Sequence, residues 1–165
     1  MASRTRKQVW LKRFAVAAAL LVVLGFVALE ALRFAAGRAG VREVVLPIGS
    51  EIEQIATGAD YVDAYRAPLG CSGLSIASLM PVNAERETVR TASEVVYRGT
   101  APGLHYFASY ILEPPEDPTR FVLATAVFYD SVLGSIYFTP VKQVHRRAVP
   151  FAVSIQAKGW CKDDR

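Results

Sequence analysis

The clearest hydrophobic pattern in the chain is an uncharged apolar run near its N-terminus. It extends from Phe14 to Leu29 (FAVAAALLVVLGFVAL) and follows a basic segment at residues 1–13. Sixteen helical residues span about 24 Å, and the mixed flank that follows brings this to the ~30 Å of a hydrocarbon core. The pattern therefore predicts one transmembrane helix over residues 14–36. The apolar residues expected to anchor it are Phe14, Leu20, Leu21, Val22, Val23, Leu24 and Phe26.

Two other interpretations of this run stay open. A basic segment followed by an apolar stretch is also typical of a cleaved signal peptide, and an apolar helix can instead pack inside a soluble core. Small residues at the spacing that cleavage requires occur only at Gly37 and Ala39, after Glu30 and Arg33 have interrupted the run. We therefore favour an uncleaved anchor.

Several shorter patterns after residue 57 predict strands. Residues 60–67 (DYVDAYRA) read as a strand, and a turn with Gly and Pro follows at 68–73 (PLGCSG). Residues 74–80 (LSIASLM) fit either a strand or one short helix. We assign them to a strand, together with strands in residues 85–96, where Thr and Val are frequent.

Two runs rich in aromatic and branched residues predict a β-hairpin. They are residues 104–112 (LHYFASYIL) and 121–129 (FVLATAVFY), and the EPPEDPT segment between them has the length of a hairpin loop. Odd and even positions are both largely apolar, so neither face of the hairpin is expected to be fully solvated. The pattern indicates a sheet curled around a helix, with its outer face covered by a membrane surface or a partner.

Apolar residues after Asp130 recur at spacings of 4, 3, 4, 3 and 4, which is one face of an amphipathic helix. Lys142 and Arg146 fall on the opposite face. Pro140 is compatible with a helix that begins there, whereas Pro150 lies inside the pattern and is expected to kink it. The recurring apolar residues are Tyr137, Val141, Val144, Ala148, Phe151 and Ile155.

These elements predict an α+β protein in which a transmembrane helix precedes an antiparallel β-sheet wrapped around a long C-terminal helix. Residues 37–57 mix Gly, Pro and charge, so we expect a linker there, or in part a first short strand. Residues 58–165 are long enough for one soluble domain with a core of its own.

Charge is concentrated before the apolar run. Five of the 19 Lys and Arg residues lie there, which leaves 14 against 15 Asp and Glu in the rest of the chain. The folded part therefore lacks the basic excess that a nucleic-acid binder needs. Five cations before the run and three soon after it predict a cytoplasmic N-terminus and an extracytoplasmic domain on a single-pass protein of the cell membrane. The five are Arg4, Arg6, Lys7, Lys12 and Arg13.

Cysteine, histidine and carboxylate residues give no recognisable catalytic or metal-binding motif. Cys71 and Cys161 lack paired spacing, so we expect no metal site, and a disulfide between them is open if the domain is extracytoplasmic. A thiolate at Cys71 paired with a histidine is disfavoured. Asp60 and Asp63 are interpreted as solvated charges. The phosphate-binding, dinucleotide-binding and Gly-x-Ser-x-Gly motifs are missing, so we expect no cofactor and assign no catalytic residue.

The C-terminal third, with ATAVFYDSVLG followed by SIYFTPVKQVHRRAVP, resembles the family catalogued as domain of unknown function 2867. The residues that carry the resemblance are Gly134, Tyr137, Pro140, His145 and Arg146, and the DYVDAY run at 60–65 is similar to that family's opening strand. The resemblance covers residues 58–153. It implies a helix-grip fold similar to the Bet v 1 and polyketide-cyclase group, in which a sheet and a long helix enclose an apolar cavity.

The chain also departs from that family. The polar stretch that the family has before its penultimate strand is replaced here by PGLHYFAS, which lacks the acidic and Arg positions. A shared polar site is therefore not expected. The helices that close the cavity in the family are shortened between residues 68 and 85, which implies a smaller or more open cavity.

Our hypothesis is a membrane-anchored domain that binds a small apolar or lipid-like ligand between sheet and C-terminal helix. The bilayer and this ligand are the expected partners, and no protein partner is identified. A rival is a non-catalytic domain that docks its outer sheet face on another membrane protein. A third interpretation, a cyclase-like enzyme that uses His145 as base, requires a carboxylate beside that imidazole within the cavity. The candidate ligand-binding residues are Tyr106, Tyr110, Tyr137, Val141 and His145.

Overall fold

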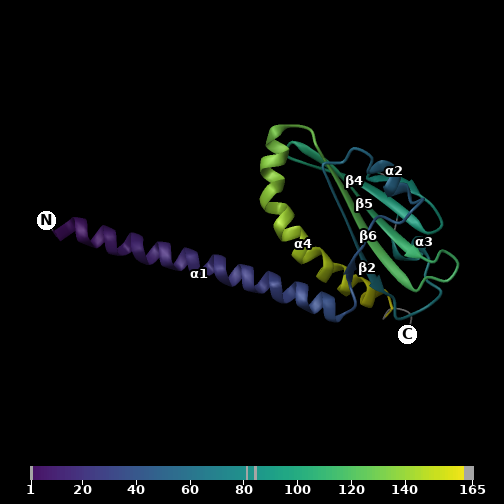
Figure 1. The fold of residues 1–165 in the computed structure, drawn as a ribbon, viewed down its shortest axis with the longest axis horizontal. Coiled ribbons are helices and arrows are strands. Elements are labelled where there is room, and N and C mark those ends of the chain that lie inside the picture. The colour runs from purple at the N-terminus through teal and green to yellow at the C-terminus, as the bar shows by residue number, and fades with distance from the viewer. Residues whose placement is uncertain (1, 81, 84, 162–165) are drawn as a thin grey trace.

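A long N-terminal helix leads into an open antiparallel sheet that carries a second long helix across one face (Figure 1). The structure is a computed structural model that describes residues 2–80, 82, 83 and 85–161. It confirms the predicted α+β class and the order of its main elements. These are α1 (Ala2–Arg38), β1 (Arg42–Glu43), α2 (Glu51–Ile55), β2 (Tyr61–Pro68), α3 (Ile76–Leu79), β3 (Glu87–Arg90), β4 (Glu94–Ala101), β5 (Leu104–Glu113), β6 (Arg120–Tyr129) and α4 (Val132–Trp160).

In the described chain the six strands form one sheet in the order β1-β2-β6-β5-β4-β3, with antiparallel neighbours throughout. The predicted strand at 60–67 is confirmed as β2, and the predicted hairpin is confirmed as β5 and β6. The strand predicted over residues 74–80 is wrong. Ser75 and Ser78 satisfy each other's backbone N–H groups in a capping box, and this starts the short helix α3 instead.

Helix α1 continues without a break through the basic segment and the apolar run. Among the described residues it is the one helix long and apolar enough to cross a membrane, over Val16–Arg38. All seven predicted anchor residues are exposed. Because none of the apolar window is buried in the protein, the interpretation as a core helix is wrong. The basic side chains of the 1–13 segment lie outside the described residues.

The last turns of α1 belong to the folded domain. Ala36 is 1% exposed and packs beside Val153 and Ala157 of α4. Six residues earlier, Glu30 accepts a hydrogen bond from Nε of Arg147, so the contact with α4 extends over two turns. The apolar span therefore passes directly into the domain core as continuous helix.

The segment at residues 37–57, expected as a linker, contains β1 and α2 and covers the outer face of the sheet. Ile52 of α2 is fully buried against this face, where it meets Val122 of β6. The backbone N–H groups of Glu51 and Ile52 donate to the buried carboxylate of Glu94 at 2.8 and 3.1 Å. The cover that the two-sided apolar hairpin requires thus comes from the chain itself, which corrects the expectation of a membrane or partner there.

Helix α4 begins at Val132, earlier than predicted, so Pro140 lies in its interior as Pro150 does. Proline removes the N–H that an α-helix bonds to the carbonyl four residues earlier, and Figure 1 shows α4 bending along the sheet. The early start depends on Gly134, where a Cβ would lie 2.0 Å from the carbonyl oxygen of Gly103. The first turn of α4 therefore sits directly against the β4–β5 turn.

The buried face of α4 is rotated relative to the predicted one. The residues that meet the sheet include Gly134, Phe138 and Val153, whereas Val144 and Ile155 of the predicted stripe are 48% and 56% exposed. The spacing rule failed here because α4 is apolar on two sides. One side packs on the sheet, and the other side contacts α1.

A disulfide joins Cys71, in the turn after β2, to Cys161 at the end of α4. Next to it, the Trp160 ring packs edge-on against Phe121 of β6, with ring centroids 4.6 Å apart. The bridge and this aromatic contact together hold the C-terminal end of α4 on the sheet. The bond also leaves Cys71 without a thiol, so it cannot act as a nucleophile in this state.

Replacing both cysteines by serine is expected to lower the free energy of unfolding by about 2–4 kcal/mol, because the bridge restricts the unfolded chain across a separation of 90 residues. Denaturant unfolding of the full chain in detergent micelles measures the difference. Wild-type protein treated with a reductant is the control and should match the variant. Equal free energies of unfolding for the oxidised wild type and the variant would contradict a stabilising Cys71–Cys161 disulfide.

Candidate functional site

A groove of about 320 Å³ lies between the inner face of the sheet and the first half of α4. Strands β4, β5 and β6 form its floor, and one side of α4 forms its wall. All five residues predicted to bind a ligand line this groove: Tyr106, Tyr110, Tyr137, Val141 and His145. The structure therefore brings the complete set of candidates to one surface.

The groove exists because two small residues face each other at the centre of the floor. Ala108 of β5 is the register partner of Thr125 of β6. On either side along the hairpin the partners are bulky, Tyr106 with Val127 and Tyr110 with Leu123. Side chains on one face of a strand recur every second residue, so this small pair between two large pairs leaves a depression beneath α4.

The two floor tyrosines are held in place by their neighbours. Tyr106 lies over Gly99, its partner on β4, where a Cβ would come within 2.3 Å of the phenol ring. Tyr110 stacks on Phe121 and meets Tyr97 edge-on. Burial raises the pKa of Tyr110 above its ordinary value, so its hydroxyl keeps its proton at neutral pH. Both rings thus present fixed apolar surface with a polar tip.

His145, which lines the groove, belongs to a polar cluster around Asp63 of β2. The Asp63 side chain is fully buried and accepts a 2.5 Å hydrogen bond from the Tyr61 hydroxyl. Nε2 of His145 lies 3.2 Å from the same carboxylate. Burial, and then the bond to Asp63, raise the pKa of Tyr61, so the phenol stays a donor. The carboxylate is therefore held between a phenol and an imidazole.

This pairing leaves one nitrogen of His145 available to the groove. In the neutral tautomer with Nε2–H donating to Asp63, Nδ1 is an acceptor, and in the protonated ring it is a second donor. No residue that the structure describes forms a hydrogen bond with Nδ1 of His145. The arrangement can bind the polar group of an otherwise apolar molecule, and it also supplies the oriented imidazole that a histidine base needs.

Sequence reasoning missed Tyr61 and Asp63. The interpretation of Asp63 as a solvated charge is wrong, because the residue is only 4% exposed. The signal was present in the strand period: Asp63 lies between Tyr61 and Tyr65 at alternate positions of β2, so all three side chains share the face that meets α4. The interpretation of Asp63 as a solvated charge relied on the residue type, because aspartate is mostly exposed in proteins, and did not use that pattern.

The other candidate groups lie away from the groove. His105 pairs with Asp130 at 2.7 Å and stacks on Phe128, on the opposite face of the sheet. Within the described ranges no three His, Cys, Asp or Glu side chains gather in a way that could hold a metal ion. The groove is thus the concave site that contains the predicted residues.

Comparison with known proteins adds no relative: no family model matches the chain, and no curated protein or solved structure matches it either. The resemblance to the domain of unknown function 2867 family therefore stays a prediction, and the function must be argued from the site alone.

Asp63→Ala is expected to lower the free energy of unfolding by about 2–4 kcal/mol, because it leaves the Tyr61 hydroxyl and an imidazole nitrogen without their partner in a buried position. Asp63→Asn keeps an acceptor for Tyr61 and should cost less. Thermal unfolding of the full chain in micelles, with Val62→Ala on the exposed side of the same strand as control, measures both. A wild-type stability for Asp63→Ala would show that this polar cluster does not hold β2 and α4 together.

Proposed function

We propose that the chain is a single-pass, membrane-anchored module that binds a small apolar or lipid-like molecule in the groove between the sheet and α4. The observation that carries this proposal is the depression over Ala108 and Thr125, bordered by tyrosines and by His145. Mostly apolar walls with a few convergent polar groups are typical of sites for small ligands. A long helix packed across an antiparallel sheet is also what the proposed helix-grip fold requires.

The proposed location is the extracytoplasmic side of the cell membrane. The cation excess before the apolar run favours a cytoplasmic N-terminus. The Cys71–Cys161 disulfide supports the same orientation, because such bonds persist in oxidising compartments and are rare in the cytosol.

The main rival remains a protein-interaction domain that docks through its outer sheet face. Much of that face is occupied by residues 44–59, and the half-buried His105, Phe107 and Phe128 remain at one end. A cyclase-like activity is the other alternative. Asp63 lies beside the His145 imidazole but is not among the residues that line the groove, so the condition of a carboxylate within the cavity is met only in part. The rival and the proposal differ in whether a ligand occupies the groove.

Photolabelling with a diazirine-bearing palmitic acid tests the proposal on the full chain in lipid nanodiscs. The probe is expected to label peptides of β5 and α4 as well as those of the bilayer-spanning α1. Val141→Trp, which fills the groove, should reduce labelling of β5 at least fivefold and leave α1 labelling unchanged, because the probe is excluded from the groove only.

Val144→Trp is the matched control. It makes the same exchange one turn along α4, on a side chain that points away from the sheet, and it should label as wild type does. Labelling confined to α1 in the wild type, or equal labelling of β5 in both variants, would reject ligand binding in the groove and favour the interaction domain.

A further inference from the structure

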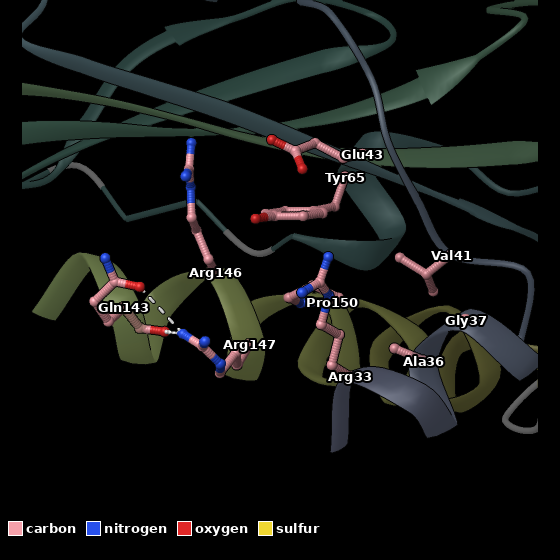
Figure 2. Close-up of a pocket in the computed structure, with 10 residues that line it drawn as sticks. All are labelled: Arg33, Ala36, Gly37, Val41, Glu43, Tyr65, Gln143, Arg146, Arg147 and Pro150. Atoms are coloured by element: carbon pink, nitrogen blue, oxygen red, sulfur yellow. Dashed lines mark hydrogen bonds between the residues drawn. The ribbon is translucent and has the colours of Figure 1, made fainter. Parts of the chain in front are cut away.

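A second hollow, of about 450 Å³, lies where the end of α1 meets α4 and the β1–β2 edge of the sheet (Figure 2). It shares no lining residue with the groove. Its polar lining comes from four elements. The residues are Arg33 of α1, Glu43 of β1, Tyr65 of β2, and Gln143, Arg146 and Arg147 of α4. Small and apolar residues complete the wall.

Two of the three guanidinium groups are not neutralised by an ion pair. Arg147 is engaged, because it donates to Glu30 and to the backbone and side-chain oxygens of Gln143. Arg33 and Arg146 form no ion pair with any carboxylate of the described chain. Glu43 is the one carboxylate among the described lining residues. The hollow therefore offers one anion and two cations without an ion pair, one of which, Arg146, lies over the Tyr61 ring at 5.7 Å.

The Tyr65 hydroxyl gives independent evidence that something polar belongs in this space. Tyr65 is 3% exposed, and no residue that the structure describes forms a hydrogen bond with its hydroxyl. Figure 2 shows the ring lying with its hydroxyl directed into the hollow, toward Arg146. Burial and the nearby Asp63 raise the pKa of Tyr65, so the hydroxyl is a donor. Buried hydroxyls in folded proteins are nearly always paired, so a missing acceptor is expected here.

The hollow also lies at the depth of lipid headgroups if α1 spans the bilayer. Arg33 lies three residues before Ala36, where the predicted span ends, and this is about 5 Å along the helix, a distance that a long arginine side chain can extend toward the headgroups. The headgroup layer extends about 5–7 Å beyond the hydrocarbon core on each side. At this depth the phosphates of the bilayer are the most abundant acceptors.

We propose that this hollow binds the headgroup of an amine-bearing phospholipid, with the phosphate toward Arg33, Arg146 and the Tyr65 hydroxyl and the ammonium toward Glu43. Guanidinium groups bind phosphate oxygens through paired, charge-assisted hydrogen bonds. A primary ammonium donates charge-assisted hydrogen bonds to a carboxylate. A glycerol headgroup can donate only through neutral hydroxyls, and a choline headgroup has no N–H to donate. The site goes beyond the groove and does not depend on the groove binding a ligand.

Native mass spectrometry of the full chain tests this site. The chain is released from micelles that contain equal amounts of phosphatidylethanolamine, phosphatidylglycerol and phosphatidylcholine with the same acyl chains. We expect the ethanolamine lipid to be retained about tenfold over the others. Arg33→Gln should lower that retention about tenfold. Arg38→Gln is the matched control, since it removes the same charge from the same helix end outside the hollow, and it should have no effect.

Two further variants separate ligand binding from a structural role. Glu43→Gln should abolish the preference for the ethanolamine lipid over the glycerol lipid. Tyr65→Phe should weaken retention without lowering the thermal midpoint in lipid-free micelles, because the hydroxyl it removes has no hydrogen-bond partner in the described part of the chain. Retention unchanged in Arg33→Gln, or phosphatidylglycerol retained best by wild type, would overturn the proposal. Displacement of the lipid by an equal concentration of soluble glycerophosphoethanolamine would overturn the assignment to a membrane lipid.

Discussion

The structure depends on α4 being packed on two sides at once. One side of the helix lies on the inner face of the sheet through Phe138 and Val153, and its second half is covered on the other side by the last turns of α1. A helix that is apolar on two sides needs both contacts to be stable in water. Helix α1 is therefore a structural part of the domain, and the domain is held at a fixed position relative to the apolar span of this helix.

Both hollows follow from the way α4 is fixed at its ends. The Gly103–Gly134 contact holds its first turn against the β4–β5 turn, and the Cys71–Cys161 bond holds its last. Between these points the helix lies over small floor residues on one side, which gives the groove. Where α1 meets it, the second hollow is lined by the small residues Ala36 and Gly37 and by the longer side chains of Arg33 and Arg147. The row formed by Tyr61, Asp63 and His145 joins α4 to β2 through polar contacts.

Local patterns were enough to predict much of this fold. The aromatic and branched residues of β5 and β6 and the uncharged run of α1 are patterns within single segments, and they predicted those elements and the groove residues that β5 contributes. Asp63, the face of α4 and the cover supplied by Ile52 were missed, because each is decided by contacts with distant segments. On α4 in particular, the predicted stripe combines Tyr137 and Val141, which line the groove, with Val144 and Ile155, which are exposed.

The claim that α1 is a retained anchor holding the domain outside the cytoplasm is tested most directly by membrane topology. The measurement combines a reporter that is active on one side of the membrane, fused at the C-terminus, with the intact mass of the purified chain. The account predicts an uncleaved mass and a reporter active only on the extracytoplasmic side. A mass that lacks the apolar run, or a reporter active in the cytoplasm, would contradict it.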